Sequence, residues 1–143
     1  MPTAYRLLRL TAGARVAVKN TSAVPDADLH AAIRALGREL PGVLDRYLIH
    51  VRRSDWDCGR IHYGVTYTDH PDVPWRGLGT IVVRTPGPRN TGTQWLDTLA
   101  HEAKHAEQWS SGVYRRQRRD RQGEPNARAF AAWFRREHLA GAI

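Results

Sequence analysis

Hydrophobic and polar residues alternate in several short stretches of the chain, which is the pattern of half-buried β-strands. The first two stretches, 5–11 and 14–20, lie on either side of Ala12-Gly13, and their arginines favour strands at the edge of a sheet. Three further stretches are rich in β-branched and aromatic residues and are separated by Asp, Gly and Pro: 47–53, 60–68 and 78–85. The pattern predicts a small sheet, mixed or antiparallel, of three or more strands.

Helical spacing replaces the alternation between the second and third of these stretches. Asp26 or Asp28 begins the predicted helix, and Pro41-Gly42 ends it. One side of this helix carries the apolar residues Leu29, Ile33, Leu36 and Leu40. We therefore expect an N-terminal helix that packs on the sheet.

Two more helices are predicted in the last third of the chain. The first has Thr93 as a candidate N-cap and Ser110-Ser111-Gly112 as a stop signal. Its apolar residues recur at helical spacing: Trp95, Leu96, Leu99 and Ala103. The second begins at Glu124, with Pro125 near the first helical position. The predicted order, a helix, three strands and two helices, indicates one α+β domain over residues 1–143.

The first of these two helices contains the sequence His101-Glu102-Ala103-Lys104-His105. Residues four apart on a helix share one face, with Cβ atoms roughly 5 to 6 Å apart, so the two imidazoles can bind one ion. A catalytic zinc ion takes three protein ligands and keeps a fourth position for water, from which Glu102 can accept a proton. The alternative is a pair of histidines on a solvated or otherwise satisfied helix face.

A third ligand is required, and the following helix supplies the candidate. The metzincin pattern would have Gly at position 108 and His at position 111, where this chain has Gln108 and Ser111. Glu124, Ala127 and Ala131 share one helix face at spacings of i, i+3 and i+7. Small alanines allow this helix to pack closely on the histidine helix, which predicts that the Glu124 carboxylate reaches the metal.

Taken together, these residues resemble the gluzincins, a family of zinc metallopeptidases. That family has His-Glu-x-x-His on one helix and Glu-x-x-Ala on the next, matched here by His101, Glu102 and His105 and then by Glu124 and Ala127. The resemblance covers about the last third of the chain. It implies a zincin-like fold, Zn²⁺ bound by the two histidines and Glu124, Glu102 as the catalytic base, and a peptide or protein substrate.

The resemblance also implies how the site is supported and how substrate binds. In the small gluzincin core, the sheet edge beside the metal binds an extended substrate by strand addition, so residues 79–84 are the expected substrate-binding strand. The family often has Asp or Asn directly after the alanine of the second helix, where this chain has Arg128. Asp97, four residues before His101, can orient an imidazole or can simply complement the first helical turn.

The composition indicates one folded domain that does not enter a membrane. Its 143 residues are 41% hydrophobic, which suffices for one modest core. No apolar run is long enough to span a bilayer, and residues 1–20 lack the apolar segment of a signal peptide. The one cysteine, Cys58, excludes an internal disulfide framework, so we expect a cytoplasmic protein.

The formal net charge of +8 supports a second interpretation. Arginines are dense from Arg115 to Arg121, between the two ligand helices, where they can pair with phosphates or form a solvated surface. The alternative function is therefore a non-catalytic, zinc-stabilised module that binds nucleic acid or an acidic partner through this cluster. Glu102 discriminates between the two functions, because a purely structural metal site gains nothing from a base there.

The sequence leaves the group that stabilises an oxyanion open. Each candidate can equally be an ordinary surface or core residue, because only geometry establishes such a role. The candidates are His62, His70, His138, Tyr63 and Tyr114.

Overall fold

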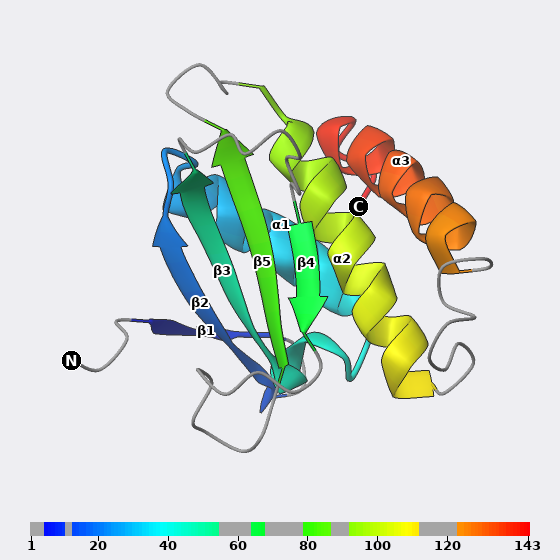
Figure 1. Cartoon of the computed structure of the whole chain (residues 1–143), viewed down its shortest axis with the longest axis horizontal. Helices are drawn as coiled ribbons and strands as arrows, with labels where there is room; N and C mark the ends of the chain where they lie inside the picture. Colours follow the sequence, from blue (N-terminus) through cyan, green and yellow to red (C-terminus); the bar gives the residue numbers. More distant parts are fainter. Residues whose placement is uncertain (1–4, 11–12, 55–63, 68–78, 87–91, 112–122) are drawn as a thin grey trace.

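A five-stranded mixed sheet forms the centre of the computed structural model, which describes residues 5–10, 13–54, 64–67, 79–86, 92–111 and 123–143 (Figure 1). The strands lie in the order β1-β2-β3-β5-β4, with the three inner strands parallel and the two edge strands antiparallel to their neighbours. Their bounds are Arg6–Arg9 for β1, Arg15–Thr21 for β2, Tyr47–Ser54 for β3, Gly64–Tyr67 for β4 and Gly79–Pro86 for β5. The expected α+β class and mixed sheet are confirmed.

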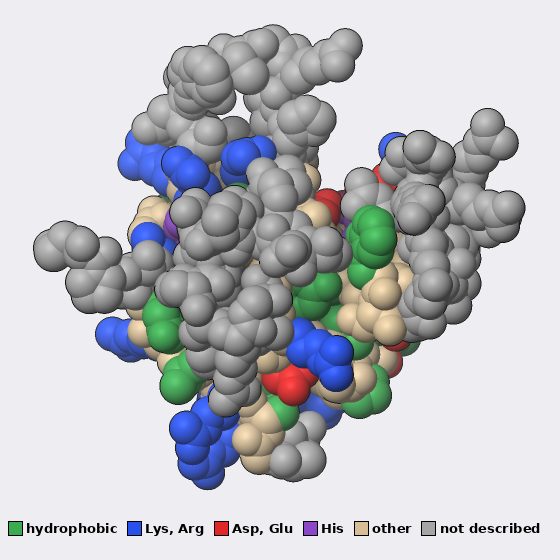
Figure 2. Space-filling model, turned by 60° about the horizontal axis from the view of Figure 1, so that its bottom comes forward, with side chains coloured by type: hydrophobic (Ala, Val, Ile, Leu, Met, Phe, Trp, Pro, Cys, Tyr) green, Lys and Arg blue, Asp and Glu red, His purple; other side chains and the backbone are tan. Residues whose placement is uncertain are grey.

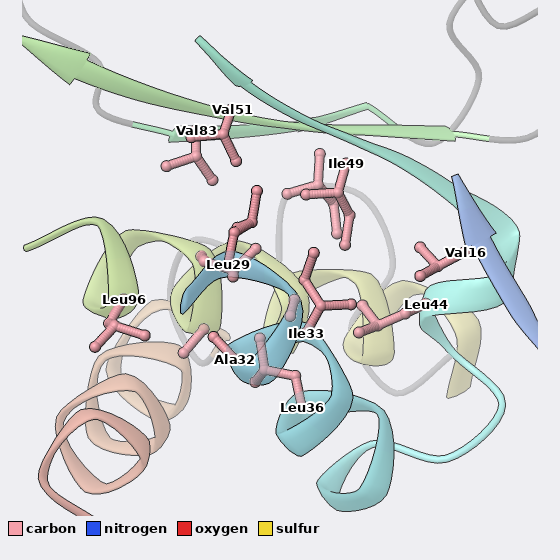
Figure 3. Close-up of a cluster of buried hydrophobic side chains, with 14 of the residues drawn as sticks. Val16, Leu29, Ala32, Ile33, Leu36, Leu44, Ile49, Val51, Val83 and Leu96 are labelled. Carbon is pink, nitrogen blue, oxygen red and sulfur yellow. The ribbon is translucent and has the colours of Figure 1, made fainter. Parts of the chain in front are cut away.

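Three α-helices are present in the described part of the chain: α1 (Asp26–Glu39), α2 (Gln94–Ser111) and α3 (Glu124–Leu139). A short 3-10 helix, η2 (Leu44–Arg46), leads into β3. The α-helices lie on one side of the sheet (Figure 3), and α2 lies between β4 and α3 (Figure 1). Each helix begins where its sequence signals predict. None of the helices described is long and apolar enough to cross a membrane.

The core lies between the inner face of the sheet and the helices (Figure 3). Alternate residues of β2, β3 and β5 meet α1 there, and each of the following is completely buried: Val16, Ile49, Val51, Ile81, Val83, Leu29, Ile33 and Leu36. Burying one such side chain contributes about 1.5 to 3 kcal/mol relative to leaving it exposed. The resulting layer fixes the sheet on which α2 rests.

The substrate-binding strand expected at residues 79–84 is wrong as an edge strand. These residues belong to β5, whose two sides pair with β3 and β4, so its backbone hydrogen-bonding groups are already used. Strand β4 forms the edge of the sheet beside α2. It precedes β5 in the sequence and runs antiparallel to it. Of the predicted strand 60–68, residues 64–67 are confirmed, and the remainder lies outside the described residues.

Positive charge is visible at several places on one face of the described surface (Figure 2). The Lys and Arg side chains form several separate groups there. The dense cluster from Arg115 to Arg121 lies outside the described residues. The described surface therefore offers no single basic patch on this face.

His50 makes stability depend on pH. It lies on β3 beside Lys19 of β2, and burial together with the charges of Lys19 and Arg52 lowers the pKa of His50 from 6.5 to about 4. The unfolded chain then binds a proton at higher pH than the folded chain, so the free energy of unfolding should fall as the pH drops from about 6.5 towards 4. His50→Gln should remove about 1 kcal/mol of that fall, a value discounted for solvent screening of a half-buried group. Urea unfolding at neutral and acidic pH measures this effect, and an equal fall in both proteins would contradict it.

Candidate metal centre

The face of α2 that carries the motif is polar, whereas its other face is anchored in the core. Leu99, Ala103 and Ala106 are completely buried, which fixes the rotation of the helix. His101 and His105 then lie one turn apart with their rings edge to face, and their Nε2 atoms are 3.2 Å from each other. The predicted pairing of the two imidazoles on one face is thus present.

The next helix brings Glu124 to the same point. Ala127 and Ala131 of α3 are completely buried, and α3 packs closely along α2. Glu124 Oε1 lies 2.5 Å from His105 Nε2, and Oε2 lies 3.3 Å from His101 Nε2. Ala127 and Ala131 therefore form the close-packing surface that the sequence predicts.

Two nitrogens and one carboxylate therefore converge, and the three groups could hold a metal ion. Zinc bonds of about 2.0 to 2.1 Å in a tetrahedron place neighbouring ligand atoms about 3.3 Å apart. The distance from His101 Nε2 to His105 Nε2 is 3.2 Å and that from His101 Nε2 to Glu124 Oε2 is 3.3 Å, so both fit this spacing. The third distance, 2.5 Å from His105 Nε2 to Glu124 Oε1, is that of a hydrogen bond and would have to lengthen around an ion. The donor set, imidazole and carboxylate, suits zinc chemically.

The neighbouring histidines keep the Glu124 carboxyl in its ionised form. Burial alone would raise the pKa of the Glu124 carboxyl, but the adjacent His101 and His105 imidazoles outweigh this and lower it below its ordinary value. An ionised carboxylate is the form that coordinates metal. His105 is almost completely buried, whereas His101 and Glu124 are partly exposed, so the cluster opens to solvent on one side only.

Gln108 supports the cluster in a way that the sequence did not predict. Its side-chain oxygen lies 2.9 Å from His105 Nδ1, and its side-chain nitrogen donates to the Gly123 carbonyl at 3.0 Å. With Nδ1–H donating to this oxygen, Nε2 of His105 keeps its lone pair for the shared site. The same amide ties α2 to the start of α3. Its position three residues after His105, on the same helix face, is the signal that could have indicated this role.

Glu102 lies beside the cluster without belonging to it. Its side chain is buried, and the Thr66 hydroxyl lies 2.7 Å from Oε1 and 3.0 Å from the Glu102 carbonyl oxygen. The other carboxylate oxygen, Oε2, is 3.9 Å from His101 Nε2. Thr66 on β4 therefore holds Glu102 with one oxygen on the metal side.

A cleft of about 280 Å³ lies over these groups. Its walls come from β4, α2 and α3, and the lining residues are Gly64, Asp97, Thr98, His101, Glu102, Glu124 and Arg128. A Cβ atom at Gly64 would lie 2.7 Å from Glu102 Cγ and 2.7 Å from Thr98 Cγ2, closer than side chains pack. Glycine is thus what allows β4 to lie directly against Glu102.

Asp97 is the candidate for orienting an imidazole, and His138 is one of the candidates for stabilising an oxyanion. The two residues lie in different parts of the structure. Asp97 lines the cleft, but among the described residues no hydrogen bond joins it to His101. His138 lies in the last turn of α3, stacked on Phe134 with ring centroids 5.3 Å apart, and it lines a different cleft. Since Glu124 begins the same helix, the full length of α3 separates His138 from the cluster, and its proposed oxyanion role is wrong.

The other oxyanion candidates lie outside the described residues: His62, His70, Tyr63 and Tyr114. Cys58 lies outside them as well. Comparison of the chain with models of known families, with curated proteins and with solved structures finds no match.

Proposed function

We propose that the protein is a zinc-dependent peptidase of the gluzincin type. The observation that carries the proposal is the buried carboxylate of Glu102, which does not belong to the ligand group but lines the same cleft as His101 and Glu124. A structural zinc site uses closed coordination and has no need of a buried base beside it. The non-catalytic binding module explains the three ligands but leaves Glu102 and its hydrogen bond from Thr66 without a purpose.

In this mechanism the chain holds the ion and moves one proton. His101, His105 and Glu124 would hold zinc, which when bound would supply an acidified water and polarise the scissile carbonyl. Glu102 accepts the proton of the attacking water through Oε2, the oxygen that Thr66 does not occupy. The protonated Glu102 then donates to the leaving amine, so the proton taken in the first step is returned in the second.

The edge strand β4 gives the substrate a place to bind. Among the described strands none pairs with the outer side of β4, and Gly64 of this strand lines the cleft. An extended peptide added to this edge would hydrogen-bond to backbone groups and bring its carbonyl over the metal cluster. The mixed sheet with its helices on one side is compatible with a zincin-like fold, which remains part of the proposal.

The test begins with protein purified without a metal-affinity tag. Elemental analysis should give one zinc per chain, and a peptide library should be cleaved by the zinc-loaded protein and spared after chelation. Cleavage restored by added zinc would support the peptidase. Absence of bound metal even after zinc addition would overturn it and favour a metal-free binding protein.

Replacing Gly64 with Ala should impair the base without removing a ligand. The added Cβ would force Glu102 and Thr98 to move, and misplacing a reacting group by about 1 Å can cost on the order of 100-fold in rate. We expect kcat/KM to fall roughly 10- to 100-fold, with about 1 to 3 kcal/mol lost from the free energy of unfolding. Kinetics and zinc analysis of the same preparation measure this, and unchanged kinetics would show that the base is not held by this contact.

A further inference from the structure

Arg128 is the one cationic side chain among the residues described as lining the cleft. It lies one helical turn after Glu124, and its side chain is 77% exposed. Within the described part of the chain its ion pair is with Glu124, where Nε and Oε2 are 3.8 Å apart. That distance is too long for a strong hydrogen bond, so the guanidinium keeps donors available for another acceptor.

The other charged groups in the cleft indicate which kind of acceptor Arg128 can bind. Asp97, Glu102 and Glu124 are all carboxylates, and under the proposed function a divalent cation compensates the two that adjoin it. A substrate carboxylate would therefore be repelled along much of the cleft and attracted at Arg128. Guanidinium groups also match carboxylates in geometry, since two parallel hydrogen bonds can form.

The arrangement of the walls places Arg128 within reach of a bound peptide. The helix that carries the histidines lies between β4 and α3 (Figure 1), and the cleft over the cluster is lined both by Gly64 of β4 and by Arg128 of α3. A peptide extended along β4 alternates its side chains between two directions. Peptide side chains that point from β4 across the cluster towards α3 would meet Arg128 close to the scissile bond.

We propose that Arg128 selects peptides that carry an Asp or Glu side chain close to the scissile bond. This inference rests on the proposed peptidase function for its substrate, although its binding step can be tested without turnover.

The experiment uses a peptide library made of matched pairs. In each pair, one position carries Glu in one peptide and Gln in the other. The zinc-loaded wild type should cleave the Glu peptide about three- to tenfold more efficiently at one position near the bond, the range expected for an accessible charge-assisted pair. Arg128→Gln should bring this ratio close to one, Arg128→Glu should invert it, and added salt should weaken it in the wild type. Arg136→Gln is the matched control, because Arg136 is exposed on the same helix outside the cleft, and it should keep both the ratio and the basal activity.

Binding of the same peptides to zinc-loaded Glu102→Gln protein separates this inference from the proposed function. Preferential binding of Glu peptides that is lost with Arg128→Gln, but without cleavage by the wild type, would overturn the peptidase and leave the inference standing. Cleavage with a ratio near one at every position, or a ratio that survives Arg128→Gln, would overturn the inference and leave the peptidase standing. Neither binding nor cleavage of any peptide would overturn both.

Discussion

Glu102→Gln should lower kcat/KM for peptide hydrolysis by about 100- to 10,000-fold, the usual contribution of a positioned general base. The amide has the shape of the carboxylate and can still accept a hydrogen bond from Thr66, so packing and the contact with β4 are retained. It cannot accept a proton from water at neutral pH. We therefore expect zinc content and the free energy of unfolding to stay close to those of the wild type while turnover is lost.

A matched substitution on the same helix provides the control. Glu107 lies five residues further along α2, outside the cleft, and pairs with Lys104. Glu107→Gln should leave kcat/KM within about twofold of the wild type, since the partly exposed ion pair that it removes lies outside the cleft. Steady-state kinetics on one defined peptide, with zinc measured in each preparation, compares the three proteins. Full activity of Glu102→Gln would refute the mechanism, whatever the zinc content.

The sequence was sufficient for the ligands because their relationships are local. His101 and His105 are joined by a helical repeat, and Glu124 was indicated by the alanines that share its face. Within one helix, spacing determines which side chains meet. The step from one helix to the next required only that α3 pack on α2, and the small alanines on the face of Glu124 indicate that packing. The predicted group His101, His105 and Glu124 is therefore found together in the structure.

The contacts of the base could not be predicted in the same way. Thr66 and Gly64 reach Glu102 across 36 and 38 residues of sequence, and no local pattern marks either residue. Their role depends on the order of strands in the sheet. Alternation identifies a strand and its buried face, but it does not say which strand lies at the edge. The family resemblance predicts 79–84 as the edge strand, but β4 occupies that edge.

The position of β4 also shows why a buried base is possible here. A carboxylate removed from water is costly unless it is hydrogen-bonded, and the hydroxyl of Thr66 supplies that bond. Gly64 leaves room for the carboxylate beneath the strand. The edge strand would thus serve twice in the proposed function, since it positions Glu102 and, among the described strands, has no neighbour on its outer side.

Replacing either proposed metal ligand should abolish zinc binding. The accompanying loss of stability in the metal-free protein should be larger for the ligand that is more deeply buried. Glu124→Ala removes a partly exposed carboxylate and its contacts with the two histidines, so we expect loss of zinc with a smaller loss of stability in the metal-free protein than His105→Ala causes. His105→Ala removes a buried ring and leaves the Gln108 side-chain oxygen without that partner, which should cost about 1 to 3 kcal/mol even without metal. Only the wild type should gain stability from zinc, by about 2.7 kcal/mol when free zinc is 100 times the dissociation constant.

Thermal unfolding with zinc and with chelator, together with elemental analysis, tests this expectation, and His30→Ala on α1 serves as the control outside the cluster. The informative result is the difference in stability between the two ligand variants, measured in the presence of chelator. A general loss of folding would lower the stability of both variants equally. Zinc retained at one ion per chain in Glu124→Ala would remove Glu124 from the ligand set. Zinc-dependent stabilisation that survives in both variants would place the ion elsewhere in the chain, and the cleft over Glu102 would then have no metal chemistry to perform.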